Sequence, residues 1–181
     1  MSTTARAASA SLTEPPAYDE YAEYYRRYVD AVPAGDLLVT LERQLEEMVT
    51  LLDTFGEARA GHRYGPEKWS VREVVGHVVD AERIFTMRAL CAARGETSPL
   101  PGFDENAYVA HSNADARTLN ALMGELTAVR RATLAIFRSL DETALARRVT
   151  ASGHPVTARA LAWITAGHER HHVRILRERY G

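Results

Sequence analysis

Three histidines stand within five residues near the C-terminus, at His168, His171 and His172. In an α-helix, residues four apart lie about 40° apart around the axis, so His168 and His172 would leave one face a turn apart and could share a metal ion. Leu161 and Ile175 share the face of His168, which predicts that this face points into a core. Burying two imidazoles without partners would cost roughly a few kcal/mol, and a shared metal converts that cost into coordination energy. The spacing therefore predicts a metal site containing His168 and His172, with His171 turned toward the flank.

The third ligand must come from upstream, because only nine residues follow His172 and none of them is histidine. His77 is the best candidate, since Val74 and Ala81 lie on its helical face and predict that it points into the core. By itself, His77 would be interpreted as a hydrogen-bonded core histidine. Three imidazoles from two helices, with an open coordination position, are typical of catalytic zinc sites. We therefore predict one divalent ion on His77, His168 and His172, with zinc as the first choice and nickel, manganese or iron as alternatives.

Two carboxylates close to these histidines are the candidates for catalysis. Glu169 lies about 100° from His168 around the helix, and is either a solvated surface residue or a carboxylate that serves the site. Asp80 follows His77 by about one turn, and either orients a ligand imidazole or pairs with an arginine. Residues 168–172 also fit the H-E-x-x-H signature of metalloproteases, in which the Glu is the general base. That class takes its third ligand from farther downstream, so we consider the protease interpretation weaker.

Four amphipathic segments can position these residues. Each has apolar residues at steps of three and four and is bounded by capping or turn residues, over residues 37–55, 71–94, 119–140 and 158–179. No strand-like alternation of useful length lies between them. Four helices of about 30 Å bury four apolar stripes most economically as a four-helix bundle. We therefore predict an all-α bundle, preceded by a short tyrosine-rich helix over residues 18–31.

Length and composition limit the class of protein. A chain of 181 residues with 46% hydrophobic and 25% charged residues is typical of one soluble domain, which we place at residues 18–181 after a mobile tail over residues 1–17. The net charge of -2 disfavours a nucleic-acid partner. The sequence has no apolar run of transmembrane length and no hydrophobic signal segment, and its single cysteine suits a reducing compartment. We therefore predict a cytoplasmic protein with no membrane partner.

Motifs along the chain resemble one known family, the DinB/YfiT-like metal-dependent proteins. The resemblance runs from about Tyr18 to Tyr180. It rests, in order, on Lys68-Trp69-Ser70, His77 with Asp80, Glu82-Arg83, Arg88-Ala89-Leu90, Leu100-Pro101-Gly102-Phe103, the run from Arg159 to Ile164, and Gly167-His168-Glu169 with His171-His172. The resemblance implies a four-helix bundle with one divalent metal on three histidines, which map onto His77, His168 and His172. It also implies a homodimer.

The resemblance implies a metal-dependent enzyme without naming its substrate. Characterised relatives include thiol-dependent S-transferases and a maleylpyruvate isomerase that uses a small bacterial thiol. An open position on zinc can bind a thiol as the thiolate or lower the pKa of a water toward about 7. Our leading hypothesis is an enzyme that activates a small thiol and transfers it to a small-molecule electrophile. The alternatives are a hydrolase that uses metal-bound water and a non-catalytic, metal-stabilised stress or interaction bundle.

The long loop after the second predicted helix is expected to form the mouth of the pocket, by its position alone. Its candidate residues are Phe103, Asp104, Glu105, Asn106 and Tyr108. The remaining histidines lie in loops without a ligand-like neighbour in the sequence, and we expect them at the surface: His62, His111 and His154.

Overall fold

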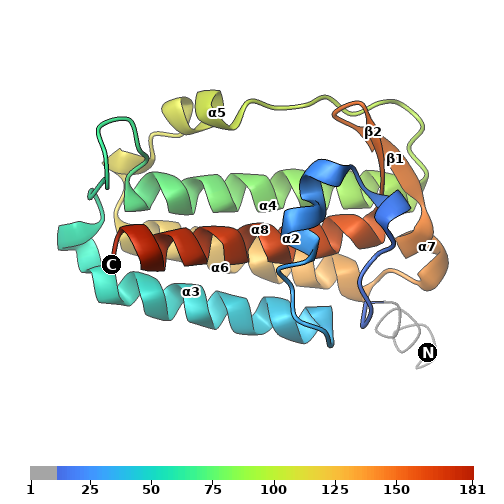
Figure 1. The fold of residues 1–181 in the computed structure, drawn as a ribbon, viewed down its shortest axis with the longest axis horizontal. Coiled ribbons are helices and arrows are strands. Elements are labelled where there is room, and N and C mark those ends of the chain that lie inside the picture. Colours follow the sequence, from blue (N-terminus) through green and yellow to red (C-terminus); the bar gives the residue numbers. More distant parts are fainter. Residues whose placement is uncertain (1–11) are drawn as a thin grey trace.

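The four helices expected from the apolar periodicity are present in the computed structural model, which describes residues 12–181. They are α3 (Leu37–Arg59), α4 (Val71–Arg94), α6 (Leu119–Arg138) and α8 (Ala158–Arg179). Together they form a four-helix bundle, as predicted (Figure 1). Within the described chain, no helix is long and apolar enough to cross a membrane.

Local sequence signals place the ends of these helices. The side chains of Asp36 and Thr157 accept hydrogen bonds from backbone amides in the first turns of α3 and α8. Ser70 and Glu73 form a capping box at the start of α4, and Gly95 ends that helix in a left-handed conformation. The caps fix where α4 and α8 begin, and both helices continue without interruption through the histidines that they carry.

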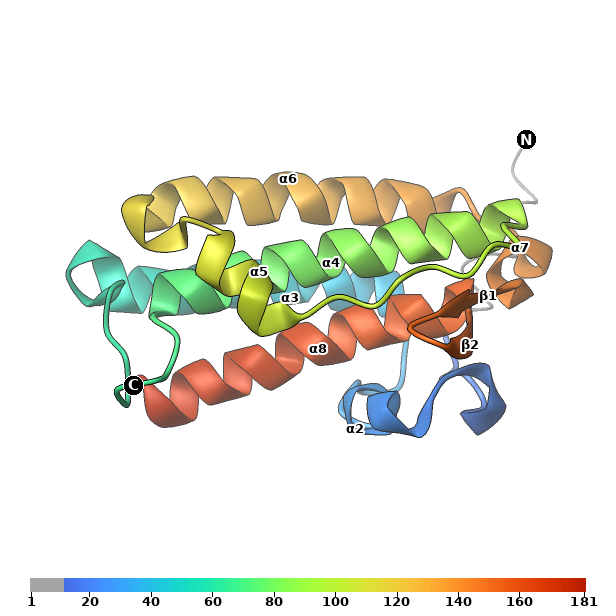
Figure 2. The ribbon, with the colours of Figure 1, turned by 90° about the horizontal axis from the view of Figure 1, so that it is seen from above.

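The connection between α4 and α6 crosses the length of the bundle. Helices α3 and α4 occupy one diagonal, since each packs against both α6 and α8. Figures 1 and 2 show that α4 and α6 run in one direction while α3 and α8 run in the other. The chain must therefore return along the bundle between α4 and α6. It does so over residues 95–118, where α5 (Glu105–His111) packs on α4.

A two-stranded hairpin joins α7 (Glu142–Ala146) to α8, although the sequence showed no strand-like alternation between the helical segments. Strand β1 (Arg148–Ala151) pairs antiparallel with β2 (His154–Thr157). Ser152 and Gly153 at the tip both have positive φ, which is the geometry of a tight two-residue hairpin turn. Strands of four residues are too short to show a clear alternation, so the sequence pattern does not separate them from a loop.

Shorter elements take the place of the expected N-terminal helix. Two 3₁₀ turns, Tyr18–Glu20 and Glu23–Tyr25, precede α2 (Arg26–Val29). Helix α2 packs on α8, where the carbonyl of Tyr28 lies so close to Gly167 that a Cβ atom there would overlap it. The close approach sets the tyrosine-rich segment against the helix that carries two of the histidines.

Part of the expected tail is packed against the bundle. The Leu12 side chain is fully buried, and its carbonyl oxygen accepts a hydrogen bond from the Leu37 amide at the start of α3. Residues 12–17 therefore belong to the folded part of the chain. Residues 1–11 of the expected tail lie outside the described residues.

A buried polar layer separates two hydrophobic clusters along the bundle. At its centre, Arg130 of α6 is fully buried and donates hydrogen bonds to the carboxylates of Glu82 and Glu169. Its third nitrogen donates to the carbonyl oxygen of Leu41 at 2.6 Å. These partners lie on α4, α8 and α3, so a single guanidinium connects all four bundle helices.

Candidate metal centre

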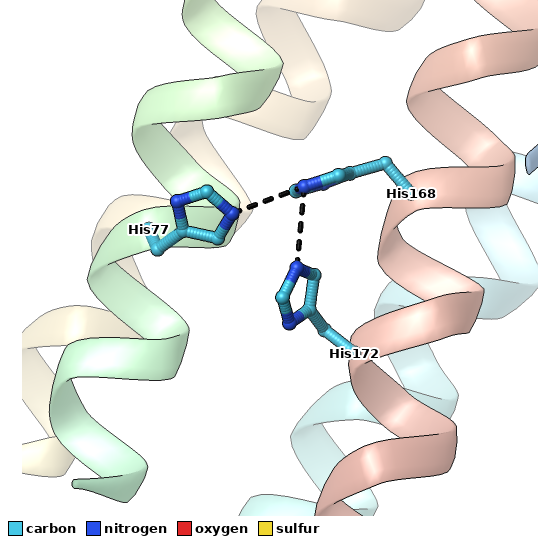
Figure 3. Close-up of side chains that lie close together, drawn as sticks. All are labelled: His77, His168 and His172. Atoms are coloured by element: carbon cyan, nitrogen blue, oxygen red, sulfur yellow. Dashed lines mark hydrogen bonds between the residues drawn. The ribbon is translucent and has the colours of Figure 1, made fainter. Parts of the chain in front are cut away.

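Three histidine side chains from two helices meet inside the bundle. His77 on α4 and both His168 and His172 on α8 are at most 8% exposed. The Nε2 atoms of His77 and His168 are 3.0 Å apart, and those of His168 and His172 are 3.2 Å apart. Figure 3 shows the three rings turned toward the space between the two helices. The structure thus brings together the three residues that the helical spacing selects.

The three imidazoles are neutral near pH 7. Burial lowers the pKa of His77 to about 4, against a smaller opposing effect of the Glu105 carboxylate. Burial also lowers the pKa of His168 and His172 well below 6.5, and the neighbouring histidines lower it further. A neutral imidazole presents a ring lone pair, which is the form that binds metal.

This donor set fits a divalent metal ion. The Nε2 atom of His168 faces two other Nε2 atoms. A ring nitrogen carries either one proton or one lone pair, so it can make one good hydrogen bond but not two. Hydrogen bonding alone therefore does not account for three nitrogens at these distances. One nitrogen from each residue lies within 4.8 Å of the others. Tetrahedral zinc with bonds of about 2.1 Å separates its ligands by about 3.4 Å, which is close to the two short distances. No carboxylate or thiol of residues 12–181 joins the group, so coordination positions stay open to a ligand.

A cavity of about 450 Å³ opens beside the three histidines. Segments from both ends of the chain form its walls. Six of the lining residues are Tyr, Trp or Phe: Tyr24, Tyr25, Tyr28, Trp69, Phe85 and Phe103. Two of these rings pack on the histidines, with the Trp69 ring centre 4.8 Å from that of His77 and the Phe85 ring centre 5.6 Å from that of His168. The aromatic contacts limit the rotation of the imidazoles, and polar side chains occupy other parts of the wall.

The crossover loop supplies part of the cavity wall, as expected from its position, but through only some of its candidates. Phe103 and Glu105 line the cavity. Asp104 instead caps α5, since its side chain accepts hydrogen bonds from two backbone amides of that helix. Tyr108 is 48% exposed and packs on Phe103 at a ring distance of 5.3 Å. Glu105 is therefore the carboxylate that the loop brings to the histidines.

Neither of the two carboxylates proposed for catalysis lines this cavity. Glu169 is 1% exposed, so it is not a solvated surface residue, and it pairs with Arg130 at 2.6 Å in the polar layer. Asp80 pairs with Arg83 at 3.4 Å, which is the arginine alternative that we considered. The structure thus gives both carboxylates ion-pair partners away from the cavity.

Several other residues that line the cavity were not predicted as site residues. His154, expected at the surface, lines the cavity from the hairpin, and Arg27 and Tyr28 line it from α2. His171 also lines it, half-buried, with its ring 5.1 Å from that of His172, but it does not join the three-nitrogen group. The cluster of tyrosines before α3 was the signal that could have indicated a wall of a site. The hairpin carried no comparable signal.

The fold agrees with comparisons to known proteins. The model of the DinB superfamily matches residues 40–176, which is more than half of the chain. The chain therefore belongs to the DinB superfamily. No curated protein matches the sequence.

Solved structures show the same fold at low sequence identity. YfiT from Bacillus subtilis, described as a probable metal-dependent hydrolase with an unusual four-helix bundle topology, is 17% identical with a TM-score of 0.69, and the match covers 91% of this chain and 90% of YfiT. The mycothiol-dependent maleylpyruvate isomerase is 19% identical with a TM-score of 0.64, over 76% of this chain and 58% of the isomerase. At these identities the likeness establishes the fold alone.

Proposed function

We propose that this protein is a metal-dependent enzyme that activates a small thiol and transfers it to an electrophilic small molecule. The observation that supports this most strongly is the open side of the histidine cluster. Three neutral imidazoles adjoin an aromatic cavity, and no fourth protein ligand is found among residues 12–181. Structural zinc sites are usually closed by four protein ligands, so an incomplete set beside a cavity favours a reactive site over a purely structural one.

A divalent ion on His77, His168 and His172, with zinc as our first choice, would hold a thiol as the thiolate and supply a sulfur nucleophile at neutral pH. Glu105 is well placed to take the proton that the thiol loses, since it lines the cavity and its charge acts on His77. The sulfur then forms a bond to the electrophilic carbon. The bond from that carbon to the leaving group breaks, and the leaving group departs with the electron pair and recovers a proton from Glu105.

The aromatic walls orient the substrate in this proposal. Burial raises the pKa of Tyr28 to about 12, so its hydroxyl stays protonated at neutral pH. The Arg27 guanidinium lies over the Tyr28 ring, 4.9 Å from its centre, and donates a hydrogen bond to the hydroxyl at 3.2 Å. This pair presents a fixed positive charge at the wall of the cavity, where it can bind an electronegative group of the electrophile.

Hydrolysis is the alternative function, and the position of Glu105 supports it equally. Glu105 could take a proton from water as readily as from a thiol, and its position beside the cluster is the same in both cases. The two functions differ in their need for a thiol. The homodimer and the cytoplasmic location stay predictions, which gel filtration with light scattering and cell fractionation would check.

Cobalt-substituted protein separates these functions. If the site binds thiols, a small thiol will produce a sulfur-to-cobalt charge-transfer band in the wild type and none in His77→Ala. If the protein is a hydrolase, the thiol will change the spectrum little, while esters or amides will be turned over without it. If fully metal-loaded protein gives neither the charge-transfer band nor turnover of esters or amides, both enzymatic proposals are contradicted. That result would support a metal-stabilised interaction protein.

A further inference from the structure

A second cavity, of about 830 Å³, lies between α2, α3 and α8. Its ionised side chains are four arginines and two glutamates: Arg27, Arg170, Arg174, Arg177, Glu47 and Glu178. The four positive and two negative groups leave a local charge of +2 on a protein whose net charge is -2. A cavity lined with one excess sign of charge concentrates ligands of the opposite sign.

Two of these arginines lack a partner within the described chain. Arg170 is partly buried, yet neither its guanidinium nor that of Arg174 makes a hydrogen bond or an ion pair with another residue of 12–181. Other buried and partly buried arginines have partners: Arg72, Arg130 and Arg159 pair with glutamates. Arg88 donates hydrogen bonds to the carbonyl oxygen of Pro101 and the hydroxyl of Ser152. A guanidinium forms its strongest hydrogen bonds with carboxylate or phosphate oxygens. The two glutamates of this cavity leave Arg170 and Arg174 without such a bond, since Glu47 pairs with Arg177 at 3.9 Å and Glu178 pairs with neither of them.

The arginine cavity adjoins the histidine cavity. Arg27 and His171 line both of them. The guanidinium of Arg27 is held over the rings of Tyr24 and Tyr28, 4.5 and 4.9 Å from their centres. One extended molecule could therefore place one end beside the three histidines and the other among the arginines, past a fixed cationic side chain.

We propose that the arginine cavity binds carboxylate groups of the molecule whose reacting end lies at the three histidines. This inference rests on the proposed function and narrows its substrate class to anionic small molecules. The planar fork of arginine receives a carboxylate through two parallel hydrogen bonds. An excess charge of +2 suits about two carboxylates, and the two glutamates in the wall oppose a more highly charged phosphate chain.

Calorimetry on metal-loaded protein tests the anion site without any reaction. Glutarate is the dicarboxylate probe and inorganic phosphate the comparison. We expect glutarate to bind the wild type at low salt and to bind Arg170→Gln/Arg174→Gln at least about tenfold more weakly. Arg131→Gln, which alters an exposed arginine of α6, is the matched control and should bind like the wild type. Equal glutarate binding by the double variant, or tighter arginine-dependent binding of phosphate, would overturn the carboxylate assignment.

A matched pair of thiols then tests whether one molecule spans both cavities. Glutathione carries two carboxylates and its diethyl ester carries none, and each is titrated into the cobalt-substituted protein. We expect glutathione to produce the charge-transfer band at a concentration at least about tenfold lower than its diethyl ester needs. This advantage of glutathione over the ester should be lost in Arg170→Gln/Arg174→Gln and kept in Arg131→Gln. An advantage that survives in the double variant would overturn the proposal. Arginine-dependent glutarate binding with no thiol band would support the anion site and contradict the thiol function, so the two failures are distinguishable.

Discussion

The carbonyl oxygen of Tyr28 lies against Gly167, in the position that a side chain on that residue would need. Gly167 immediately precedes His168, and the rings of Tyr28 and His168 are 5.4 Å apart in an edge-on contact. The absence of a side chain at one position of α8 thus allows α2 to dock and brings a wall of the cavity onto a histidine of the cluster.

Gly167→Ala should separate α2 from α8. The added methyl group overlaps backbone atoms, which cannot rotate away as a flexible side chain can, so we expect a loss of about 1–3 kcal/mol in the free energy of unfolding. Urea unfolding measures the free energy of unfolding. Titration of the cobalt-substituted variant with a small thiol should show weaker thiol binding than in the wild type. Gly124→Ala on α6 is the control, because a Cβ there meets nothing within 4 Å and should add about 1 kcal/mol of stability. A Gly167→Ala protein as stable as the wild type would contradict the close docking.

Arg130→Met should be among the most destabilising substitutions in the bundle. It leaves the carboxylates of Glu82 and Glu169 buried without their cation, which costs about 3–5 kcal/mol. Arg138→Met removes an exposed arginine that pairs with Glu42, and should change stability by less than about 1 kcal/mol. Chemical unfolding of both variants gives the comparison, and similar losses would show that the polar layer does not connect the helices as described.

The bundle and the histidine cluster follow from local patterns in the sequence. Periodic apolar residues and caps such as Ser70 and Thr157 determine where helices lie, and the spacing of His168 and His172 then determines a shared face. A match between local signals and the global fold is what makes such elements predictable.

The parts that could not be predicted depend on contacts between distant segments. Glu169 lies on a helix whose neighbours in space are not visible in the sequence, so its pairing with Arg130 could not be distinguished from exposure. The position of Glu105 depends on how far the crossover returns along the bundle. The position of His154 in the cavity wall depends on a hairpin. Its strands of four residues are too short to give a periodic signal in the sequence.

Glu105→Gln should lower turnover while leaving the metal in place. The substitution keeps the size of the side chain but removes the proton acceptor, so we expect a fall of about 10²–10⁴-fold in kcat. Metal content should stay at the wild-type level, because Glu105 does not belong to the three-nitrogen group. Asp104→Asn, which alters the cap of α5 outside the cavity, serves as the control. Full turnover by Glu105→Gln would show that another group moves the proton.

Metal-free protein should lose stability as the pH falls from 7 toward 4. Burial lowers the pKa of His77 to about 4 in the folded state, against about 6.5 when unfolded, so the unfolded chain binds more protons below pH 6.5. The contribution of His77 to the free energy of unfolding is fully present above pH 6.5. It has fallen by about 2 kcal/mol at pH 5. Urea unfolding in the presence of chelator at several pH values measures the slope. His77→Gln should show a shallower slope, and an unchanged slope would contradict the buried neutral state of His77.

Metal content per chain, measured by elemental analysis on purified variants, tests the central claim most directly. Wild-type protein and His171→Ala should each hold about one divalent ion, because His171 lies beside the cluster without joining it. His77→Ala, His168→Ala and His172→Ala should each lose most of it, since every one removes one of three nitrogens that lie within 4.8 Å of one another. Full occupancy in His77→Ala, or a loss in His171→Ala as large as in the other three, would contradict the assignment of the site.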